Sequence, residues 1–146
     1  MVISSSAVLI LDENQRFLLQ KRDQSNKIYF PGLWGLFGGA CNRDENPFEC
    51  AIREINEEIN ISISEINLFL KLEIEANSLG LFKRIRYFYV GNMNAELVKQ
   101  INLNEGCDYD FFSIENLPNP CEIVPIDLAA IMFYYQAKKN RFKLYP

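Results

Sequence analysis

The chain has 146 residues, of which 49% are hydrophobic, 13% aromatic and 23% charged, values typical of a globular protein with a proper core. Its 15 basic and 19 acidic side chains give a net charge of -4, which offers no broad attraction to a nucleic-acid backbone and argues against duplex binding. The sequence contains no histidine, which excludes an imidazole base, a Ser-His or Cys-His nucleophile and any His-ligated metal site.

The sequence carries no sign of a membrane or secretory segment. The apolar run at residues 1–11 is too short to span a bilayer and lacks the basic start of a signal peptide. No repeat, low-complexity tract or linker divides the chain. We therefore expect a single domain over residues 1–146, located in the cytoplasm and without a membrane partner.

Five strands are predicted from apolar residues that alternate with polar ones or run continuously. They lie at Ile3–Leu11, Phe17–Arg22, Leu68–Glu75, Phe82–Val90 and Tyr109–Ser113. The polar residues 12–15 between the first two have the composition of a hairpin turn.

The first of two predicted helices has strong end signals. It runs from Pro47 to Ile59, with Asn46 as N-cap and Glu49 completing a capping box. Asn60 follows as a residue that tolerates the left-handed conformation in which many helices end. Helical spacing predicts one buried stripe, formed by Phe48, Ile52, Ile55 and Ile59.

The second helix is predicted at Ile126–Lys138, with Pro125 at its start. Strands around two helices, without regular β-α-β alternation, indicate an α+β fold rather than a doubly wound one. We expect a mixed central sheet sandwiched by helices.

The four cysteines are scattered through the chain, at Cys41, Cys50, Cys107 and Cys121. None forms a C-x-x-C pair, which argues against a structural zinc site. In a chain without a secretion signal they are expected to be reduced thiols, and Cys50 is expected to be a small packing residue.

Three acidic residues share one face of the first helix. Glu54, Glu57 and Glu58 stand at relative positions 0, 3 and 4, and like charges at those spacings weaken a helix by about a few tenths of a kcal/mol per pair. A hard divalent cation such as Mg²⁺ would offset that repulsion. The alternative is a solvated acidic face with a surface pair between Arg53 and Glu57.

The surrounding residues favour the metal site. From Gly39 the chain reads Gly, five residues, Glu45, seven residues, Arg53-Glu54-Ile55, one residue, Glu57-Glu58, one residue, Asn60-Ile61. This resembles the Nudix box, G-x5-E-x7-R-E-U-x-E-E-x-G-U with U aliphatic, at eight of its nine specified positions. The departure is Asn60 in place of glycine. The approach at residues 31–39 is also similar, except for Phe37 where the family often has proline.

The resemblance implies a Nudix-type α/β/α sandwich with a loop-helix-loop motif that holds Mg²⁺ or Mn²⁺. The implied metal ligands are the carbonyl of Gly38 and the carboxylates of Glu54, Glu57 and Glu58. Glu54 is also a candidate for the base that accepts a proton from water, and Glu105 is the alternative. Arg53 and Glu45 are expected to organise the loop and helix.

Candidate substrate contacts flank the box. Arg22, Lys27, Arg84 and Arg86 are candidates for gripping phosphate, and Trp34, Tyr29 and Phe88 for stacking on a base. The competing interpretation is that the strand arginines are inert surface residues and that the aromatic residues belong to the core.

The implied function is metal-dependent hydrolysis of the diphosphate linkage of a nucleoside diphosphate joined to another moiety. Nucleoside triphosphates, nucleotide sugars and related nucleotide-like compounds remain open as substrates. Small enzymes of this kind are often dimers, so a homodimer is one option, and the sequence leaves the oligomeric state open. Two alternatives are a non-catalytic nucleotide-binding or regulatory module of the same fold and a structural domain with an acidic helix.

Overall fold

The computed structural model describes residues 2–76 and 81–140, which form one mixed sheet flanked by helices. The strands are β1 (Ile3–Leu11), β2 (Phe17–Lys21), β3 (Trp34–Gly35), β4 (Phe37–Ala40), β5 (Ile66–Ala76), β6 (Leu81–Asn92) and β7 (Asp108–Phe112). Their order is β3-β2-β1-β6-β5, with β4 also paired to β1 and β7 to β2. β1 and β6 run parallel, and the other pairs are antiparallel.

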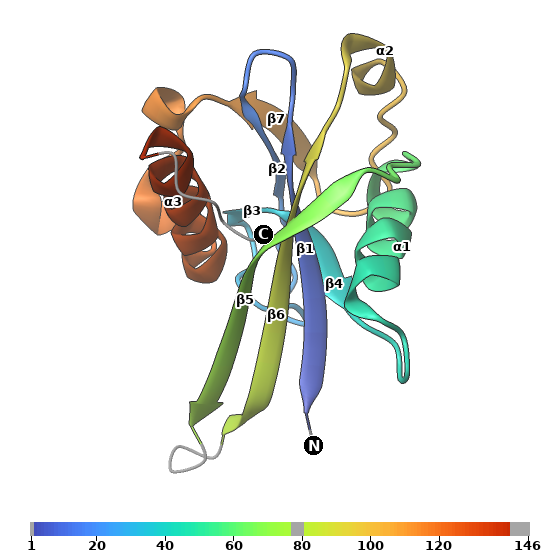
Figure 1. Ribbon diagram of the computed structural model, residues 1–146, viewed down its shortest axis with the longest axis vertical. Helices are drawn as coiled ribbons and strands as arrows, with labels where there is room; N and C mark the ends of the chain where they lie inside the picture. The colour runs from blue at the N-terminus through green and yellow to red at the C-terminus, as the bar shows by residue number, and fades with distance from the viewer. Residues whose placement is uncertain (1, 77–80, 141–146) are drawn as a thin grey trace.

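The two long helices lie on opposite faces of this sheet (Figure 1). α1 (Pro47–Ile59) covers β1 and β4, and α3 (Pro125–Lys139) lies on the other side. A short α2 (Ala95–Val98) and two 3-10 turns, Ile114–Asn116 and Pro120–Glu122, complete the helical structure of the described residues. The predicted α+β sandwich is therefore confirmed. In the described part of the chain, no helix has both the length and the apolar character needed to cross a bilayer.

β1 is the centre of the core because both of its faces are covered. Its residues 7–11 are almost completely inaccessible to solvent. Val8 and Ile10 point to the α1 side, whereas Leu9 and Leu11 join the cluster on the α3 side. A strand buried on both faces is continuously apolar rather than alternating, which is why this segment was predicted with its observed bounds. Phe37, the departure from the family's proline, is fully buried in the α1-side cluster.

The strands missed by sequence reasoning are β3 and β4, which have only two and four residues. β4 pairs with β1 in the register Ala7↔Gly38 and Ser6↔Gly39. Gly38 has φ 141°, and a Cβ atom there would collide with the carbonyl oxygen of Ser6. Only glycine therefore lets the chain pass this close to β1 while it enters the predicted metal site.

α1 has the predicted bounds, but its buried stripe differs at one end. Ile55 and Ile59 are buried, whereas Phe48 is 41% exposed in the first turn, with its ring edge-to-face against Tyr89 at 6.1 Å. The remaining buried positions of α1 are Cys50, Ala51 and Glu58. A charged residue thus occupies a position inside the packed face of the helix.

The C-terminal end of α1 gives a first prediction. Asn60 adopts φ 57° and ψ 34°, and its N–H donates to the carbonyl of Asn56 at 2.9 Å. Because glycine adopts this left-handed conformation without a steric penalty, Asn60→Gly should raise the free energy of unfolding by about 0.5 kcal/mol, and Asn60→Ala should lower it by about 1 kcal/mol. Urea denaturation measures both.

Asn140, the residue that ends α3, provides the matched control. Its φ is -88°, a conformation open to any residue, so Asn140→Gly should bring no gain. Equal stability of Asn60→Gly and Asn60→Ala would contradict the assignment of strain at the end of α1.

Candidate active site

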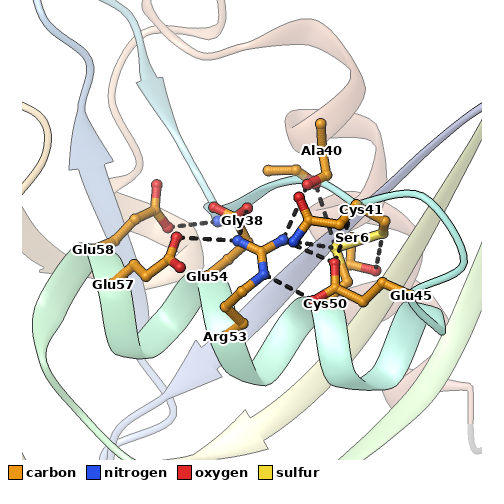
Figure 2. A network of polar contacts seen from close by, with 12 residues as sticks. Ser6, Gly38, Ala40, Cys41, Glu45, Cys50, Arg53, Glu54, Glu57 and Glu58 are labelled. Carbon is orange, nitrogen blue, oxygen red and sulfur yellow. Dashed lines mark hydrogen bonds and ion pairs between the residues drawn. A yellow bond between two sulfur atoms is a disulfide. The ribbon is translucent and has the colours of Figure 1, made fainter.

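Arg53 is the organising residue of the site. Its Nε and Nη2 donate to the two carboxylate oxygens of Glu45 at 2.8 and 2.9 Å, and Nη2 also donates to the carbonyl of Ala40 at 3.1 Å (Figure 2). The hydrogen bonds from Arg53 are the main reason that the pKa of Glu45 is lowered to about 2. One guanidinium thus joins α1 to the end of β4 and to the loop that follows it.

The same guanidinium holds two of the predicted metal ligands. Nη1 of Arg53 donates to Glu54 at 2.7 Å and to Glu57 at 3.0 Å. Partial burial raises the pKa of Glu54, although Arg53 acts in the opposite direction. Glu54 also lies against the backbone of Gly39, where an added Cβ would come within 2.5 Å of its carboxylate oxygen. Glycine at that position therefore leaves room for the carboxylate.

Glu58 is buried, with 4% of its surface exposed. Its two oxygens accept hydrogen bonds from Nε2 of Gln20 at 2.9 Å and from the N–H of Gly38 at 2.7 Å. Burial is the largest cause of the rise in its pKa to about 8, and these two hydrogen bonds oppose that rise. A buried carboxylate held only by neutral donors costs free energy when ionised, and a divalent cation would offset that cost.

Sequence reasoning did not identify Gln20. The residue is 3% exposed in β2, where its Nε2 also donates to the carbonyl of Leu36 at 3.3 Å. The available signal was a polar side chain within the apolar run of the predicted strand. Its function as the partner of Glu58 depends on the sheet and could not be read from that run.

The loop after α2 closes the C-terminal end of α1 and brings a fourth carboxylate to the site. The N–H of Asn104 donates to the carbonyl of Glu58 at 2.7 Å, and Nδ2 of Asn104 donates to the carbonyl of Glu57 at 3.0 Å. These bonds satisfy helix carbonyls that have no partner within the helix. The adjacent Glu105 is exposed, and its charge contributes to the raised pKa values of Glu54 and Glu58.

The predicted acidic residues therefore gather around Gly38, on the side of α1 that faces β4 (Figure 2). The oxygens of Glu54, Glu57 and Glu58 do not all lie within 4.8 Å of one another. Among the described residues, that spacing is met by the potential ligands Cys41, Glu45 and Cys50. Arg53 binds both Glu54 and Glu57, whereas Glu58 is bound by Gln20.

The predicted substrate residues lie in a different part of the sheet. Arg86 donates to Asp127 of α3 at 3.0 Å, and this buried aspartate also accepts from the N–H of Leu36 at 3.0 Å. Asp127 was not identified from the sequence, because its partners are distant along the chain. Phe88 is fully buried in the α3-side core, which leaves no ring face for a base.

Two other candidates, Arg22 and Arg84, contact Tyr29. Its ring lies 5.4 Å from the guanidinium of Arg84, and its carbonyl accepts from Nε of Arg22 at 2.9 Å. Trp34 packs edge-to-face on Phe112 at 5.0 Å. Lys27 is exposed near the same segment of chain. Tyr29, Arg22 and Arg84 form an aromatic and cationic surface, and among the described residues none of these candidates is bonded to the box glutamates.

The expectation of four reduced thiols is wrong for one pair. Cys41 and Cys50 are joined by a disulfide, with a Cα–Cα distance of 5.2 Å, whereas Cys107 and Cys121 are free and exposed. The pairing arises because the loop after β4 folds back on the first turn of α1. A spacing of nine residues matches no motif, so no local pattern predicts the bond.

A cavity of about 470 Å³ lies between the β1–β2 hairpin and α3. Its lining residues are Leu11, Asn14, Gln15, Phe17, Ser113, Ile114, Glu115, Tyr134, Tyr135, Lys138 and Lys139. None of the predicted site residues is among them, so the chemistry argued from the carboxylates is not located in this cavity.

The comparisons with known proteins point to the same family. A family model described as "NUDIX domain" matches residues 2–132. A dihydroneopterin triphosphate diphosphatase of Haemophilus influenzae is 33% identical over 82 residues, which are 56% of this chain and 48% of that protein. A prenyl-diphosphate phosphatase of Methanosarcina mazei is 28% identical over 121 residues, 83% of this chain and 69% of that protein.

A solved structure agrees with the fold. The crystal structure of a MutT protein from Methanosarcina mazei has a TM-score of 0.70 and 25% sequence identity, and the match covers 97% of this chain and 96% of that one. The aligned region spans about half the length of the Haemophilus influenzae relative, at 48%.

The contacts of Arg53 give a second prediction. Arg53→Ala removes hydrogen bonds to charged groups and should lower the free energy of unfolding by about 2 kcal/mol near neutral pH. The pKa of Glu45 is about 2 in the folded protein against an ordinary 4.5, so the stability from this pair is present above pH 4.5 and is lost as pH falls toward 2. The difference between Arg53→Ala and the parent protein should therefore shrink in acid.

Urea denaturation at neutral and acid pH measures this effect. Arg43→Ala is the control, because Arg43 is almost fully exposed and lies 4.0 Å from Asp44. Its effect should stay within about 0.5 kcal/mol. If the two alanine variants behaved alike, Arg53 would not be the organising contact.

Proposed function

The chain belongs to the Nudix family, and from this premise we propose that it is a divalent-metal-dependent hydrolase that cleaves the diphosphate linkage of a nucleoside diphosphate joined to another group. The main support is the buried Glu58 beside Glu54, at the box positions where the family resemblance implies metal ligands. The names of the two relatives, a triphosphate diphosphatase and a prenyl-diphosphate phosphatase, also concern compounds with linked phosphates.

Mg²⁺ or Mn²⁺ fits this set of donors. The proposed ligands are the Gly38 carbonyl and the carboxylates of Glu54, Glu57 and Glu58. All are oxygen donors, which suit hard cations, and the raised pKa of Glu58 supports a site where a nearby positive charge would keep the carboxylate ionised. When bound, such a cation neutralises phosphate oxygens and acidifies a water molecule.

The chain has no histidine, so proton transfer falls to Asp, Glu, Lys, Tyr or Cys, and a carboxylate is the proposed base. We assign Glu105 or Glu54 to this step. Glu105 is exposed and close enough to affect the pKa values of Glu54 and Glu58, which fits a group that takes a proton from water and releases it to solvent. Glu54 contacts Arg53 and the Gly39 backbone, which fits a ligand or a base fixed in place.

Arg53 and Glu45 are proposed to position the ligands rather than to contact substrate. Their paired hydrogen bonds hold the start of the loop-helix-loop motif, and both Glu54 and Glu57 depend on Arg53 for their orientation. Orientation of this kind is a general requirement of metal sites, where partners of the ligands strongly affect metal affinity.

The substrate is proposed to be small and nucleotide-like. The aromatic and cationic surface around Tyr29 offers a ring face next to a guanidinium, a combination that suits a base or a phosphate group. The residues proposed for contact are Arg22, Lys27, Trp34, Arg84 and Arg86. The proposed unit is one domain over residues 1–146, acting alone or as a homodimer in the cytoplasm.

The non-catalytic alternative finds no support in the two departures from the family pattern. Asn60 adopts the left-handed conformation that glycine would adopt, and α1 ends at the predicted residue. Phe37 is part of the buried core. Neither substitution displaces the carboxylates, so catalysis remains the better proposal.

Hydrolysis is tested with a panel of nucleoside triphosphates, nucleotide sugars and dinucleotides in Mg²⁺ and in Mn²⁺, measuring phosphate and monophosphate release. Glu58→Gln removes the buried negative charge and should lower turnover by about 100-fold or more. Glu96→Gln is the control, because Glu96 is an exposed partner of Lys99 on α2. Unchanged turnover in Glu58→Gln would remove the proposed mechanism.

Metal binding should also depend on pH in a defined direction. Burial raises the pKa of Glu58 in the folded protein to about 8 from an ordinary 4.5, so the metal-free protein loses stability as pH rises through that interval. A divalent cation competes with the proton, so the rise in melting temperature on adding Mg²⁺ should be larger at about pH 8.5 than at about pH 6.

In Glu58→Gln this difference between the two pH values should disappear. Thermal denaturation with and without Mg²⁺ measures it and requires no substrate. A Mg²⁺ shift that is equal at both pH values in the parent protein would show that Glu58 does not exchange its proton for the metal.

A further inference from the structure

We propose that Cys41 and Cys50 form a redox-modification site, a dithiol–disulfide pair that fastens the loop carrying Glu45 to the helix carrying the box glutamates. The chemistry of the pair is independent of the enzyme's activity.

Both cysteines are held in place by the backbone around them. The N–H of Cys41 donates to the carbonyl of Ser4 at 3.0 Å beside β1, and the N–H of Cys50 donates to the carbonyl of Asn46 at 3.0 Å in the first turn of α1. The resulting Cα–Cα distance of 5.2 Å lies within the range that a disulfide requires. The fold therefore places the two sulfur atoms close enough to form a bond.

The surroundings also suit the reduced form. The hydroxyl of Ser6 donates to the carbonyl of Pro47 at 2.7 Å, which leaves its oxygen as an acceptor for the Cys41 thiol at 3.6 Å. The Cys50 thiol has the carbonyl of Gly39 as an acceptor at 3.8 Å. Because each thiol has a partner already in place, the pair can open and close with little rearrangement.

A metal site is the less suitable interpretation of this cluster. The ligand atoms of Cys41, Glu45 and Cys50 lie within 4.8 Å of one another. Both oxygens of Glu45 are already bonded to Arg53, however, so two sulfur ligands remain. Structural zinc sites use four ligands, and a hard cation prefers oxygen.

The exposure of the two residues sets the order of the exchange reaction. Cys41 is partly exposed, whereas Cys50 is fully buried. A small-molecule disulfide RSSR is therefore attacked first by the Cys41 thiolate, which forms a mixed disulfide and releases one RS⁻. The Cys50 thiolate then attacks the Cys41 sulfur and releases the second RS⁻. The two protein thiols are oxidised, RSSR is reduced, and the two protons end on two RSH molecules.

The disulfide connects the same segments as the ion pair of Arg53. Cys41 follows Ala40, whose carbonyl accepts from Arg53, and Cys50 lies one turn before Glu54. A covalent bond between loop and helix thus provides a second tether in parallel with the Arg53–Glu45 contact. Oxidation should make the loop less dependent on Arg53, and reduction should make Arg53 the main tether.

The test begins with the full chain equilibrated in oxidised or in reduced glutathione, followed by alkylation and peptide mapping. Oxidation should give a cross-linked peptide containing Cys41 and Cys50, with alkylation at Cys107 and Cys121. The melting temperature should rise by about 5–10 °C relative to the reduced protein, since the bond closes a loop of about ten residues in the unfolded chain. Cys121→Ser should retain both results.

Cys41→Ser keeps a hydroxyl next to Ser6, imitates the reduced form, and should show neither the cross-link nor the thermal shift. Arg53→Ala, measured in the oxidised and in the reduced protein, tests whether the disulfide and the Arg53 contact act in parallel. The substitution should lower the melting temperature more in the reduced protein than in the oxidised protein. Separate glutathione adducts on the two cysteines, alkylation of both after oxidation, or an equal effect of Arg53→Ala in the two states would overturn the proposal.

The two proposals fail separately in this design. An absent cross-link with intact Mg²⁺-dependent hydrolysis would overturn the redox site alone. A cross-link and thermal shift in a protein that hydrolyses no diphosphate compound would support the redox site and count against the proposed function.

Discussion

The guanidinium of Arg53 is shared between Glu45, Glu54, Glu57 and the Ala40 carbonyl, and the geometry of the site follows from that sharing. Its planar set of donors matches a carboxylate at two points and still leaves Nη1 for the helix glutamates. The loop, the end of β4 and the exposed side of α1 are thereby held by one residue. A lysine would supply the positive charge but not the rigid, planar arrangement of N–H donors.

The site has more negative charge than its protein partners neutralise. Arg53 serves Glu45, Glu54 and Glu57, whereas Glu58 is left to the amide of Gln20 and the N–H of Gly38. Burial is the largest cause of the raised pKa of Glu58, and the nearby charges of Glu54 and Glu105 add to it. Because the cluster lies against β4 and the core below it, water cannot surround the carboxylate and reduce the cost. In such a site, a bound cation would lower the free-energy cost of ionising the buried carboxylate.

The parts predicted from the sequence are those determined by local signals. α1 was predicted with its observed bounds because Asn46 caps its start and Asn60 can adopt the conformation that ends it. β4 is too short and too rich in glycine to give a periodic pattern. Gln20, as the partner of Glu58, and the bond between Cys41 and Cys50 depend on contacts between elements. Hydrophobic periodicity and helix caps carry no information about contacts between elements that are distant in the sequence. These contacts are therefore seen only in the folded structure.

The attachment of the loop at Asn102 and Asn104 has a mechanical consequence. Main-chain donors of this loop bind the carbonyls of Ile59 and Glu58, and the N–H of Cys107 donates to the carbonyl of Lys21 at the end of β2 at 2.9 Å, so the loop is attached to both the helix end and the sheet. Glu105 lies between these two attachments, so its position depends on how α1 and β2 are placed relative to each other. One of the two carboxylates that we assign to proton transfer therefore lies on a short bridge between the helix that carries the box glutamates and the strand that carries Gln20, and a displacement of either element would alter its alignment with the glutamates.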